Sequence, residues 1–281
     1  MRIHHINCAT MCPYGELLIN GQGSLLAPGR MVCHCLLIET NDGLVLVETG
    51  LGLQDIAQPK DRLGGFFLTV TRPRLDPEET AVRQIARLGF RSDDVRHIVL
   101  THLDLDHAGG LSDFPKAKVH VFETEHRAAM SPSTLFERSR YRAMQWAHGP
   151  FWEIHSVKGE RWFGFDCVQA ITGIPPEVLL IPLHGHTRGH CGVAVRTPER
   201  WLLHCGDAYF FHGEVDSEPP HCPIGLRLFQ NLVQIDGDAR MRNQARLRAL
   251  AHENGNEVKV FCAHDPVEYA HMREVQPAYA V

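Results

Sequence analysis

The segment 101–110 carries four potential metal ligands within six residues: His102, Asp104, Asp106 and His107. Neighbouring side chains of an extended chain point to opposite sides, so His102, Asp104 and Asp106 would share one side. A turn at this point would bring His107 round to the others. Imidazole and carboxylate groups at this density predict that two metal ions share the segment. The alternative is a polar loop with an incidental cluster of charges.

Two glycines, Gly109 and Gly110, follow these ligands and leave room for backbone close to the site. Further along the chain, His186, Asp207 and His264 each follow an apolar run that is typical of a buried strand. A single polar residue at a strand end is more often structural than functional. Together with the first segment they form a set, and loops at strand ends are where α/β folds place their sites.

In this order the residues resemble the metallo-β-lactamase superfamily, whose signature is His-x-His-x-Asp-His followed by a distal His, Asp and His. The resemblance runs from about residue 33 to about residue 268 and includes Glu48-Thr49-Gly50, where the family usually has Asp-Thr-Gly. Gly185-His186-Thr187 and Ala263-His264-Asp265 are most similar to the lactonase and glyoxalase-II-like branches. The resemblance implies an α/β fold, the αββα sandwich of two mixed sheets flanked by helices.

Carried over position by position, the resemblance implies a centre of two divalent metal ions that Asp207 bridges. Asp207 follows Cys205-Gly206, as the bridging aspartate of the family does. The other implied ligands are His102, Asp104 and His186 for the first ion and Asp106, His107 and His264 for the second.

Asp104 departs from the family pattern, which has histidine at this position. A carboxylate is a harder ligand than imidazole, so it shifts the preference from zinc toward iron or manganese. It also adds negative charge, which lowers the Lewis acidity of the bound ion. The flavodiiron branch likewise has a carboxylate here, but this chain has no room for a flavodoxin domain. Zinc is the expected metal, with iron or manganese as alternatives.

Two residues are candidates for catalysis. Asp106 would orient a bridging hydroxide as well as bind metal, and Tyr209 could donate a hydrogen bond to the oxyanion or the leaving group. Tyr209 lies two residues after Asp207 and before two phenylalanines, so a packed aromatic at a strand end is an equal alternative. Glu48 is expected to fix a ligand histidine. His190 and His204 are expected to support ligands or to be structural.

The elements that must position these residues follow from the apolar periodicity. A β-hairpin is expected over 35–48 with Asp42-Gly43 in its turn, followed by a loop over 51–75 that contains glycines and prolines. Asp76-Pro77 and Gly89 are start and stop signals of a helix. Mixed sheets flanked by helices within a single domain, residues 1–281, are the expected architecture. Other strands are expected at 97–100, 119–122, 178–183, 191–197, 200–205 and 258–262, with helices from about 123 and over 240–251.

A lid or cap is expected at about 131–165, with a helix around 134–147. Trp146, Trp152 and Trp162 could line an apolar acyl pocket, or they could pack onto the sheets, which is the commoner fate of tryptophan. Three arginines of this segment could meet a carboxylate of the substrate, although a solvated helix face is favoured. They are Arg138, Arg140 and Arg142.

The composition indicates an ordinary globular chain, with 44% hydrophobic and 22% charged residues. The net charge of −5 and the absence of a basic run argue against a nucleic-acid partner. No segment looks like a signal peptide or a membrane span, and nine cysteines do not indicate a disulfide framework. A cytoplasmic protein with reduced thiols is expected, with no membrane partner; a homodimer is allowed.

The leading hypothesis is a metal-dependent hydrolase that cleaves an ester, most plausibly a small-molecule lactone. A glyoxalase-II-like thioesterase is the runner-up, although it needs a basic patch for the carboxylates of glutathione. An iron-dependent oxidoreductase of the same fold is favoured by Asp104 alone. A binding protein with a vestigial site is disfavoured by the complete ligand set.

Overall fold

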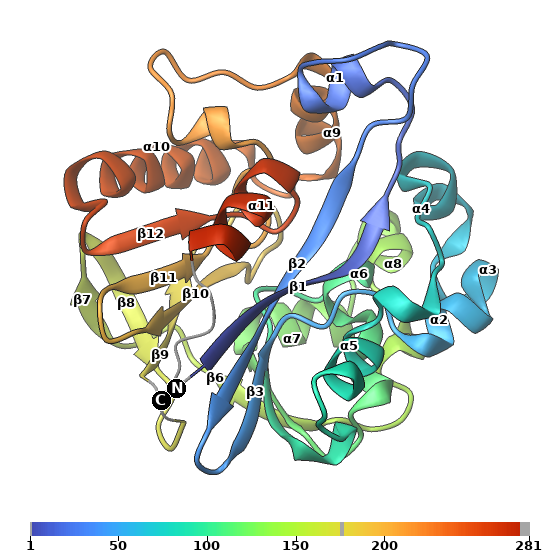
Figure 1. The fold of residues 1–281 in the computed structure, drawn as a ribbon, viewed down its shortest axis with the longest axis vertical. Helices are drawn as coiled ribbons and strands as arrows, with labels where there is room; N and C mark the ends of the chain where they lie inside the picture. Colours follow the sequence, from blue (N-terminus) through green and yellow to red (C-terminus); the bar gives the residue numbers. More distant parts are fainter. Residues whose placement is uncertain (1, 175–176, 276–281) are drawn as a thin grey trace.

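The computed structural model describes residues 2–174 and 177–275, which form two six-stranded sheets (Figure 1). In spatial order the first sheet contains β1 (Arg2–Met11), β2 (Met31–Thr40), β3 (Gly43–Val47), β4 (Val95–Val99), β5 (Lys118–Phe122) and β6 (Phe151–His155). The second contains β12 (Val258–Phe261), β11 (Trp201–His204), β10 (Cys191–Arg196), β9 (Val178–Pro182), β8 (Phe165–Ala170) and β7 (Glu160–Trp162).

Both sheets are mixed, as predicted. Strands β1 to β3 pair antiparallel and β3 to β6 pair parallel, whereas β7 to β11 pair antiparallel and β11 pairs parallel with β12. The helices are α1 (Glu16–Asn20), α2 (Leu53–Ala57), α3 (Pro59–Arg62), α4 (Gly64–Thr71), α5 (Ala81–Arg87), α6 (Leu105–Ala108), α7 (Glu123–Met130), α8 (Leu135–Arg140), α9 (Ile224–Val233), α10 (Gly237–Asn254) and α11 (Pro266–Val275).

The first sheet buries both of its faces. Leu36 and Ile38 of β2 pack between the sheets, in one apolar cluster with Leu180 of β9, while Leu37 lies in the outer cluster with Ile85 of α5. Alternate side chains of a strand point to opposite faces, so a strand covered on both sides needs a nearly continuous apolar run. This explains the run that predicted the hairpin, which is confirmed by the pairing of Thr40 with Gly43.

The second sheet is covered in the same way. Leu202 of β11 packs between the sheets, and its neighbour Leu203 lies on the outer face with Leu247 and Leu250 of α10. Figure 1 shows α10 along one side of the molecule and α5 on the opposite side, with the two sheets between them. The predicted αββα sandwich is therefore confirmed, and each fully buried leucine contributes roughly 1.5–3 kcal/mol of apolar transfer free energy.

The expectation of a loop over 51–75 is wrong, because these residues form α2, α3 and α4. The prolines and glycines that indicated a loop lie at helix boundaries, with Pro59 at the first position of α3 and Gly64 at the start of α4. The helices are held by tertiary contacts, such as the buried ion pair between Arg62 and Asp55 at 2.7 Å. Short helices of this kind have weak periodicity and leave little trace in the sequence.

The segment 131–165 divides into two parts. Thr134 caps α8 by accepting a hydrogen bond from the Glu137 backbone, and α8 ends at Arg140, earlier than expected; a 3-10 helix follows at Ala143–Gln145. The second part forms the edge strands β6 and β7. The tryptophans pack onto the sheets: Trp146 and Trp152 against the outer cluster of the first sheet, and Trp162 against that of the second.

The long N-terminal strand β1 was not predicted, since its sequence mixes histidines with apolar residues. Within residues 2–174 and 177–275 no helix has the length and apolarity to cross a lipid bilayer. The functional consequence of the topology lies at one edge of the sandwich. Strands β3, β4, β9, β11 and β12 all end there, and each is followed within four residues by a predicted ligand or by Glu48.

Candidate metal centre

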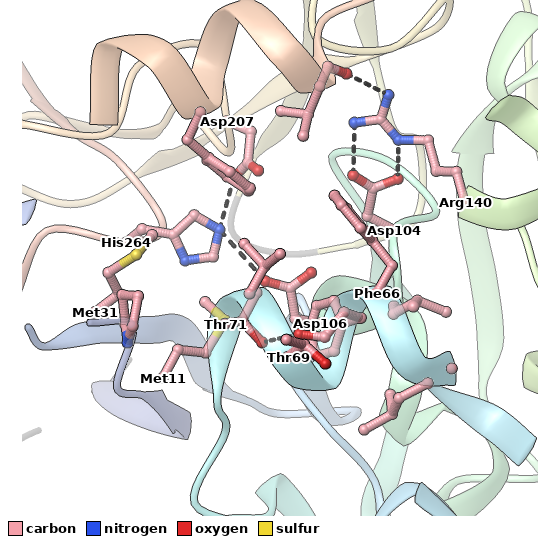
Figure 2. Close-up of a pocket in the computed structure, with 18 of the residues that line it drawn as sticks. Met11, Met31, Phe66, Thr69, Thr71, Asp104, Asp106, Arg140, Asp207 and His264 are labelled. Atoms are coloured by element: carbon pink, nitrogen blue, oxygen red, sulfur yellow. Dashed lines mark hydrogen bonds and ion pairs between the residues drawn. The ribbon is translucent and has the colours of Figure 1, made fainter. Parts of the chain in front are cut away.

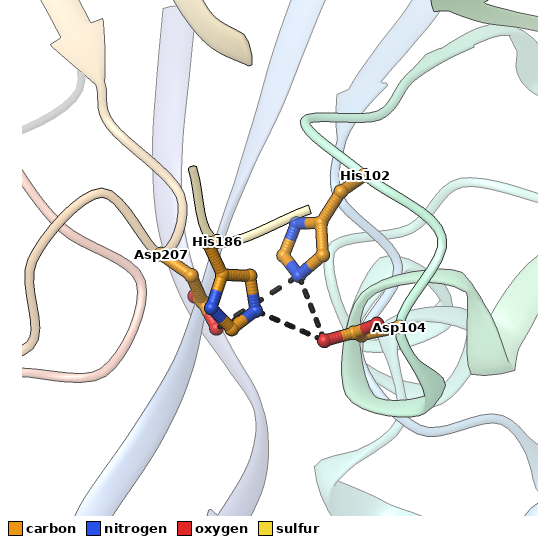
Figure 3. A group of neighbouring side chains, drawn as sticks. All are labelled: His102, Asp104, His186 and Asp207. Atoms are coloured by element: carbon orange, nitrogen blue, oxygen red, sulfur yellow. Dashed lines mark hydrogen bonds and ion pairs between the residues drawn. The ribbon is translucent and has the colours of Figure 1, made fainter. Parts of the chain in front are cut away.

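All seven predicted ligands come together at this edge. The first group contains His102, Asp104, His186 and Asp207, whose ligand atoms all lie within 4.8 Å of one another (Figure 3). The Nε2 atom of His186 lies 3.0 Å from Asp104 Oδ2 and 3.3 Å from Asp207 Oδ2. The Nε2 atom of His102 lies 3.3 Å from Asp104 Oδ2. Two imidazoles and two carboxylates thus face a common point.

The second group, Asp106, His107 and His264, lies on the other side of Asp207. The Oδ1 atom of Asp207 lies 3.2 Å from His107 Nε2 and 3.1 Å from His264 Nε2. Asp106 Oδ2 lies 3.5 Å from His264 Nε2. Asp207 therefore directs one carboxylate oxygen to each group, which is the geometry that a bridging ligand of two cations needs.

The ligand atoms of the two groups are better suited to binding cations than to forming hydrogen bonds with one another. His102 Nε2 and Asp207 Oδ1 are buried and have no hydrogen-bond partner in the described structure, although Oδ1 lies close to two histidine nitrogens. Leaving such atoms unpaired costs about 1–3 kcal/mol each, more if the group is charged. Imidazole and carboxylate are ligands that zinc, iron and manganese accept, so a divalent ion at each focus satisfies both atoms.

Other groups fix the orientation of the imidazoles. Glu48 bonds to Nδ1 of His107, as predicted, and it also accepts a hydrogen bond from the Thr101 backbone at 2.5 Å. Nδ1 of His264 donates to the Val32 carbonyl at 2.7 Å, and Nδ1 of His102 lies 2.8 Å from the Thr101 hydroxyl. With Nδ1 engaged, Nε2 of each ring is left free to bind a metal.

The bridging residue is itself held in place by His190. Nε2 of His190 accepts from the Asp207 backbone N–H at 2.9 Å, while its Nδ1 donates to the Leu183 carbonyl at 3.0 Å. His204 acts one step further away, where it accepts from the Gly206 backbone and donates to the His34 carbonyl. Both histidines support the ligand loops without joining the ligand groups.

The two groups differ in charge. Burial alone would lower the pKa of His264, but the carboxylate of Asp207 outweighs it and raises the pKa to about 9. The pKa of His186, by contrast, falls to about 4, because burial and then the guanidinium of Arg140 disfavour its protonation. A positive charge is therefore favoured on His264 in the second group and disfavoured on His186 in the first, and a bound cation would take the place of the proton on His264.

Arg140 contributes to this asymmetry. Figure 2 shows its guanidinium against Asp104, with Nε and Nη2 donating to Oδ1 and Oδ2 at 2.6 and 2.8 Å. Nη1 donates to the carbonyls of His186 and Val233, and Nη2 also lies 2.7 Å from His186 Nε2. The predicted solvated helix face is wrong for this residue, whose side chain is 6% exposed.

The Arg140–Asp104 pair explains the departure from the family pattern. Burial would raise the pKa of Asp104, but Arg140 and His102 hold it well below its usual range, so the carboxylate stays charged. The guanidinium neutralises the extra charge that aspartate brings in place of histidine. Asp104 and Arg140 are 36 positions apart in the sequence, so only the tertiary structure shows that they form a pair.

Glu125 on α7 is a second residue that the sequence did not single out. Its Oε1 accepts from the Leu103 backbone and the Tyr141 hydroxyl, both at 3.0 Å. Its Oε2 accepts from the Thr187 hydroxyl at 2.6 Å and from the Gly189 backbone at 3.0 Å. This buried carboxylate therefore ties the ligand loop 101–107 to the loop that carries His186.

The structure places Tyr209 away from the ligands. Its hydroxyl donates to Glu268 Oε1 at 2.8 Å, and its ring is fully buried in the outer cluster of the second sheet. The catalytic role expected of Tyr209 is therefore not supported, and the packed aromatic is what the structure shows. Its neighbour Phe210 points toward the centre instead, with its ring stacked on His264 at 5.1 Å.

A cavity of about 450 Å³ opens above the ligands. Its floor contains Asp104, Asp106, His186, Asp207 and His264. Its walls are mostly apolar and come from α4, α8, α9 and the start of the chain, as Figure 2 shows for several of them. The wall residues include Met11, Met31, Leu63, Phe66, Phe67, Val70, Phe136, Phe210, Leu226, Phe229 and Val233.

The comparison with family models agrees with this geometry. Residues 28–252 match the model described as the metallo-beta-lactamase superfamily. The chain belongs to the metallo-β-lactamase superfamily. The match ends before His264, and it is the fold that brings this seventh ligand to the six residues within the matched range.

The relatives of the chain are hydrolases by name. A "Probable metallo-hydrolase" of Mycobacterium tuberculosis is 44% identical over 274 residues, which cover 98% of this chain and 83% of the relative. An N-acyl homoserine lactonase of Bacillus thuringiensis is 28% identical over 192 residues, covering 66% of this chain and 69% of the relative. The chain is thus a metallo-hydrolase of this superfamily with lactonase-like relatives.

Solved structures of the superfamily share the fold. An N-acyl homoserine lactone hydrolase with the product N-hexanoyl-L-homoserine at its catalytic metal centre has a TM-score of 0.69 and 20% identity, covering 96% of this chain and 95% of that one. AidC, a dizinc quorum-quenching lactonase, has a TM-score of 0.59 and 16% identity, covering 94% and 87%. These likenesses establish the sandwich, while the ligands rest on the geometry above.

Asp104 and Arg140 should be energetically coupled. Arg140→Met should cost about 3–5 kcal/mol of unfolding free energy, because it leaves a buried carboxylate unpaired. Asp104→His should also be costly because it leaves the guanidinium unpaired. The double variant should be more stable than the sum of the two losses predicts, by more than about 1 kcal/mol in denaturant unfolding. The exposed pair of Arg127 and Glu123 is the matched control, with expected coupling below about 0.5 kcal/mol. Additive losses at Asp104 and Arg140 would contradict the pairing.

Tyr209→Phe should leave turnover within about twofold of the wild type, since the hydroxyl does not reach the ligands. It should lower the unfolding free energy by about 1–3 kcal/mol, because Glu268 loses a buried donor. Steady-state kinetics and denaturant unfolding measure the two effects separately. Phe210→Ala is the comparison variant, and it should impair turnover because Phe210 lines the cavity. A large loss of kcat in Tyr209→Phe at full metal content would restore the catalytic role.

Proposed function

We propose that this protein is a dinuclear metal-dependent hydrolase that cleaves a carboxylic ester, namely a lactone with an apolar acyl chain. The observation that carries the proposal is the arrangement of Asp207, whose two oxygens serve two ligand groups at the floor of an apolar cavity. Seven ligand side chains and a cavity of about 450 Å³ suit a small molecule with a polar head and an apolar tail.

Two divalent ions bound there would supply the Lewis acidity that polarises an ester carbonyl and activates a water molecule. His102, Asp104 and His186 would hold the first ion, Asp106, His107 and His264 the second, and Asp207 both. Asp106 reaches the cavity, and we assign it the task of orienting the attacking water by accepting its hydrogen bond. The apolar walls exclude bulk water and hold the acyl chain so that the ester lies at the floor.

The names of the relatives support an ester or lactone substrate. N-acyl homoserine lactonases from Bacillus species match the chain at 24–28% identity, and structures with this activity in their names share its fold. The mycobacterial relatives at 44% identity are named only as metallo-hydrolases. The proposed acyl chain therefore rests on the cavity of this chain.

The thioesterase alternative lacks cations for the carboxylates of glutathione. Two arginines are the cationic side chains among the described residues that line the cavity, Arg140 and Arg142. The donors of Arg140 are engaged by Asp104, His186 and Val233. Arg142 donates to the carbonyl of Asp61.

One observation favours the iron-dependent oxidoreductase, namely the carboxylate of Asp104 in the first ligand group. Zinc is the metal we propose, with iron or manganese as the alternatives that elemental analysis separates.

Asp207→Ala should reduce the metal content from about two ions per chain to below one, and turnover should fall with it, because both ions lose a shared ligand. Elemental analysis of the purified protein and ester turnover in a pH-stat measure this. Asp216→Ala, which removes an exposed carboxylate of the same segment, is the control and should retain both properties. An Asp207→Ala protein with two ions and full turnover would remove the bridging assignment.

Turnover of N-acyl homoserine lactones should rise with acyl length, by up to about fourfold in kcat/KM per methylene until the cavity is filled, since each buried methylene is worth about 0.8 kcal/mol. Phe229→Ala should flatten this dependence because Phe229 lines the cavity. Leu228→Ala on the same helix should not, because Leu228 is 62% exposed and lies outside the cavity. Turnover of thioesters alone, or of no ester by the metal-loaded protein, would reject the lactone assignment.

A further inference from the structure

Cys33 lies beside the second ligand group although the metal signature does not include it. Its thiol is buried, with 2% of the residue exposed, and Sγ lies 4.0 Å from Asp106 Oδ2. The ligand atoms of Cys33, Asp106 and His264 all lie within 4.8 Å of one another. A sulfur atom is therefore placed next to two of the residues that would hold the second ion.

The backbone of β2 fixes this placement. Nδ1 of His264 donates to the carbonyl of Val32, and the His34 backbone donates to the Ala263 carbonyl at 2.9 Å. The Cys33 backbone N–H is engaged by the Asn7 side chain at 2.8 Å. The strand that carries the thiol and the loop that carries His264 are thus bonded to each other on both sides of Cys33, so sulfur and imidazole keep a constant relation.

The distances suit ligands of one cation better than a hydrogen bond. A distance of 4.0 Å between sulfur and oxygen is at the outer limit of any hydrogen bond. Zinc–sulfur and zinc–oxygen bonds of about 2.3 and 2.1 Å place two ligands of one ion about 3.6 Å apart at the tetrahedral angle and at most about 4.4 Å apart when they lie opposite each other. The separation of Cys33 and Asp106 falls between these two limits.

His264 belongs to two triads. One contains Cys33 and Asp106, and the other contains His107 and Asp207. The second half of the centre therefore offers a cation two adjacent positions that share one imidazole. Asp106 and His264 both line the cavity, so this half of the centre has an open side toward a substrate, as a catalytic zinc site does.

We propose that Cys33 is a further thiolate ligand of the second metal ion, on the side of Asp106 and His264. The inference rests on the dinuclear centre of the proposed function. On binding, the S–H bond breaks, the sulfur binds the cation, and the proton passes to solvent. Thiolate is a soft ligand that selects zinc or cobalt over manganese, whereas Asp104 makes the first position harder. The two halves of the centre accordingly differ in the metal they prefer.

Cobalt(II) substitution tests the proposal by spectroscopy, without reference to turnover. The metal-depleted protein is titrated with cobalt(II), and the near-ultraviolet absorption is followed for sulfur-to-cobalt charge transfer. The wild type should show this band when the second ion binds. Cys33→Ala should lose it and bind the second cobalt ion at least about tenfold more weakly, as expected when a group that tunes a metal site is removed.

Cys35→Ala is the matched control, because Cys35 is two residues along the same strand and packs in an apolar cluster. It should keep both the band and the affinity. Cys33→Ser, close to the native shape, replaces Cys33→Ala if circular dichroism shows that the latter does not fold. It too should lack the band.

The outcomes separate this proposal from the proposed function. Two bound cobalt ions with visible absorption but no sulfur band would overturn the role of Cys33 and leave the dinuclear centre intact. A band that persists in the Cys33 variants would do the same, by assigning it to another thiol. A protein that binds no cobalt would overturn both. Loss of the band in the Cys33 variants, in a protein that cleaves no lactone, would support the ligand and reject the substrate.

Discussion

The central constraint on this structure is the burial of several carboxylates around one point between the ends of two sheets. Asp207 is 3% exposed and Asp106 9%, and each has a carboxylate oxygen within 3.5 Å of an imidazole nitrogen. Charges of this kind are tolerated in a protein interior only when they are paired or bind metal. The surrounding fold is arranged to hold these groups in place before a cation arrives, with Glu48 on His107 and His190 on the backbone of Asp207.

Arg140 divides the centre into two unequal halves. Its guanidinium compensates Asp104 and disfavours a proton on His186, whereas Asp106 has no arginine or lysine as an ion-pair partner among the described residues. The thiol of Cys33 lies on the side of Asp106 and His264 only, so the two halves differ both in charge and in the side chains that surround them. The aspartate at position 104, where the family has histidine, is thus neutralised by Arg140 from α8.

The cavity links this centre to a substrate class. Its floor is formed by ligand residues, and its walls come from short helices, α4, α8 and α9, that lie outside the sheets. The sheets position the candidate ligands, and the helices form the walls of the cavity above them.

The sequence by itself predicted the sandwich, through its resemblance to a known family, and the seven candidate ligands at strand ends, because apolar runs followed by His or Asp are local patterns. It did not reveal the helices over 51–75, the strand β1, the role of Glu125 or the partnership of Arg140 with Asp104. It also left open whether Tyr209 is catalytic or a packed aromatic, and only its hydrogen bond to Glu268 in the tertiary structure favours the packed aromatic. These features depend on contacts between segments far apart in the chain. Local periodicity shows which face of an element is buried, but the tertiary structure alone decides which distant side chain meets a buried charge.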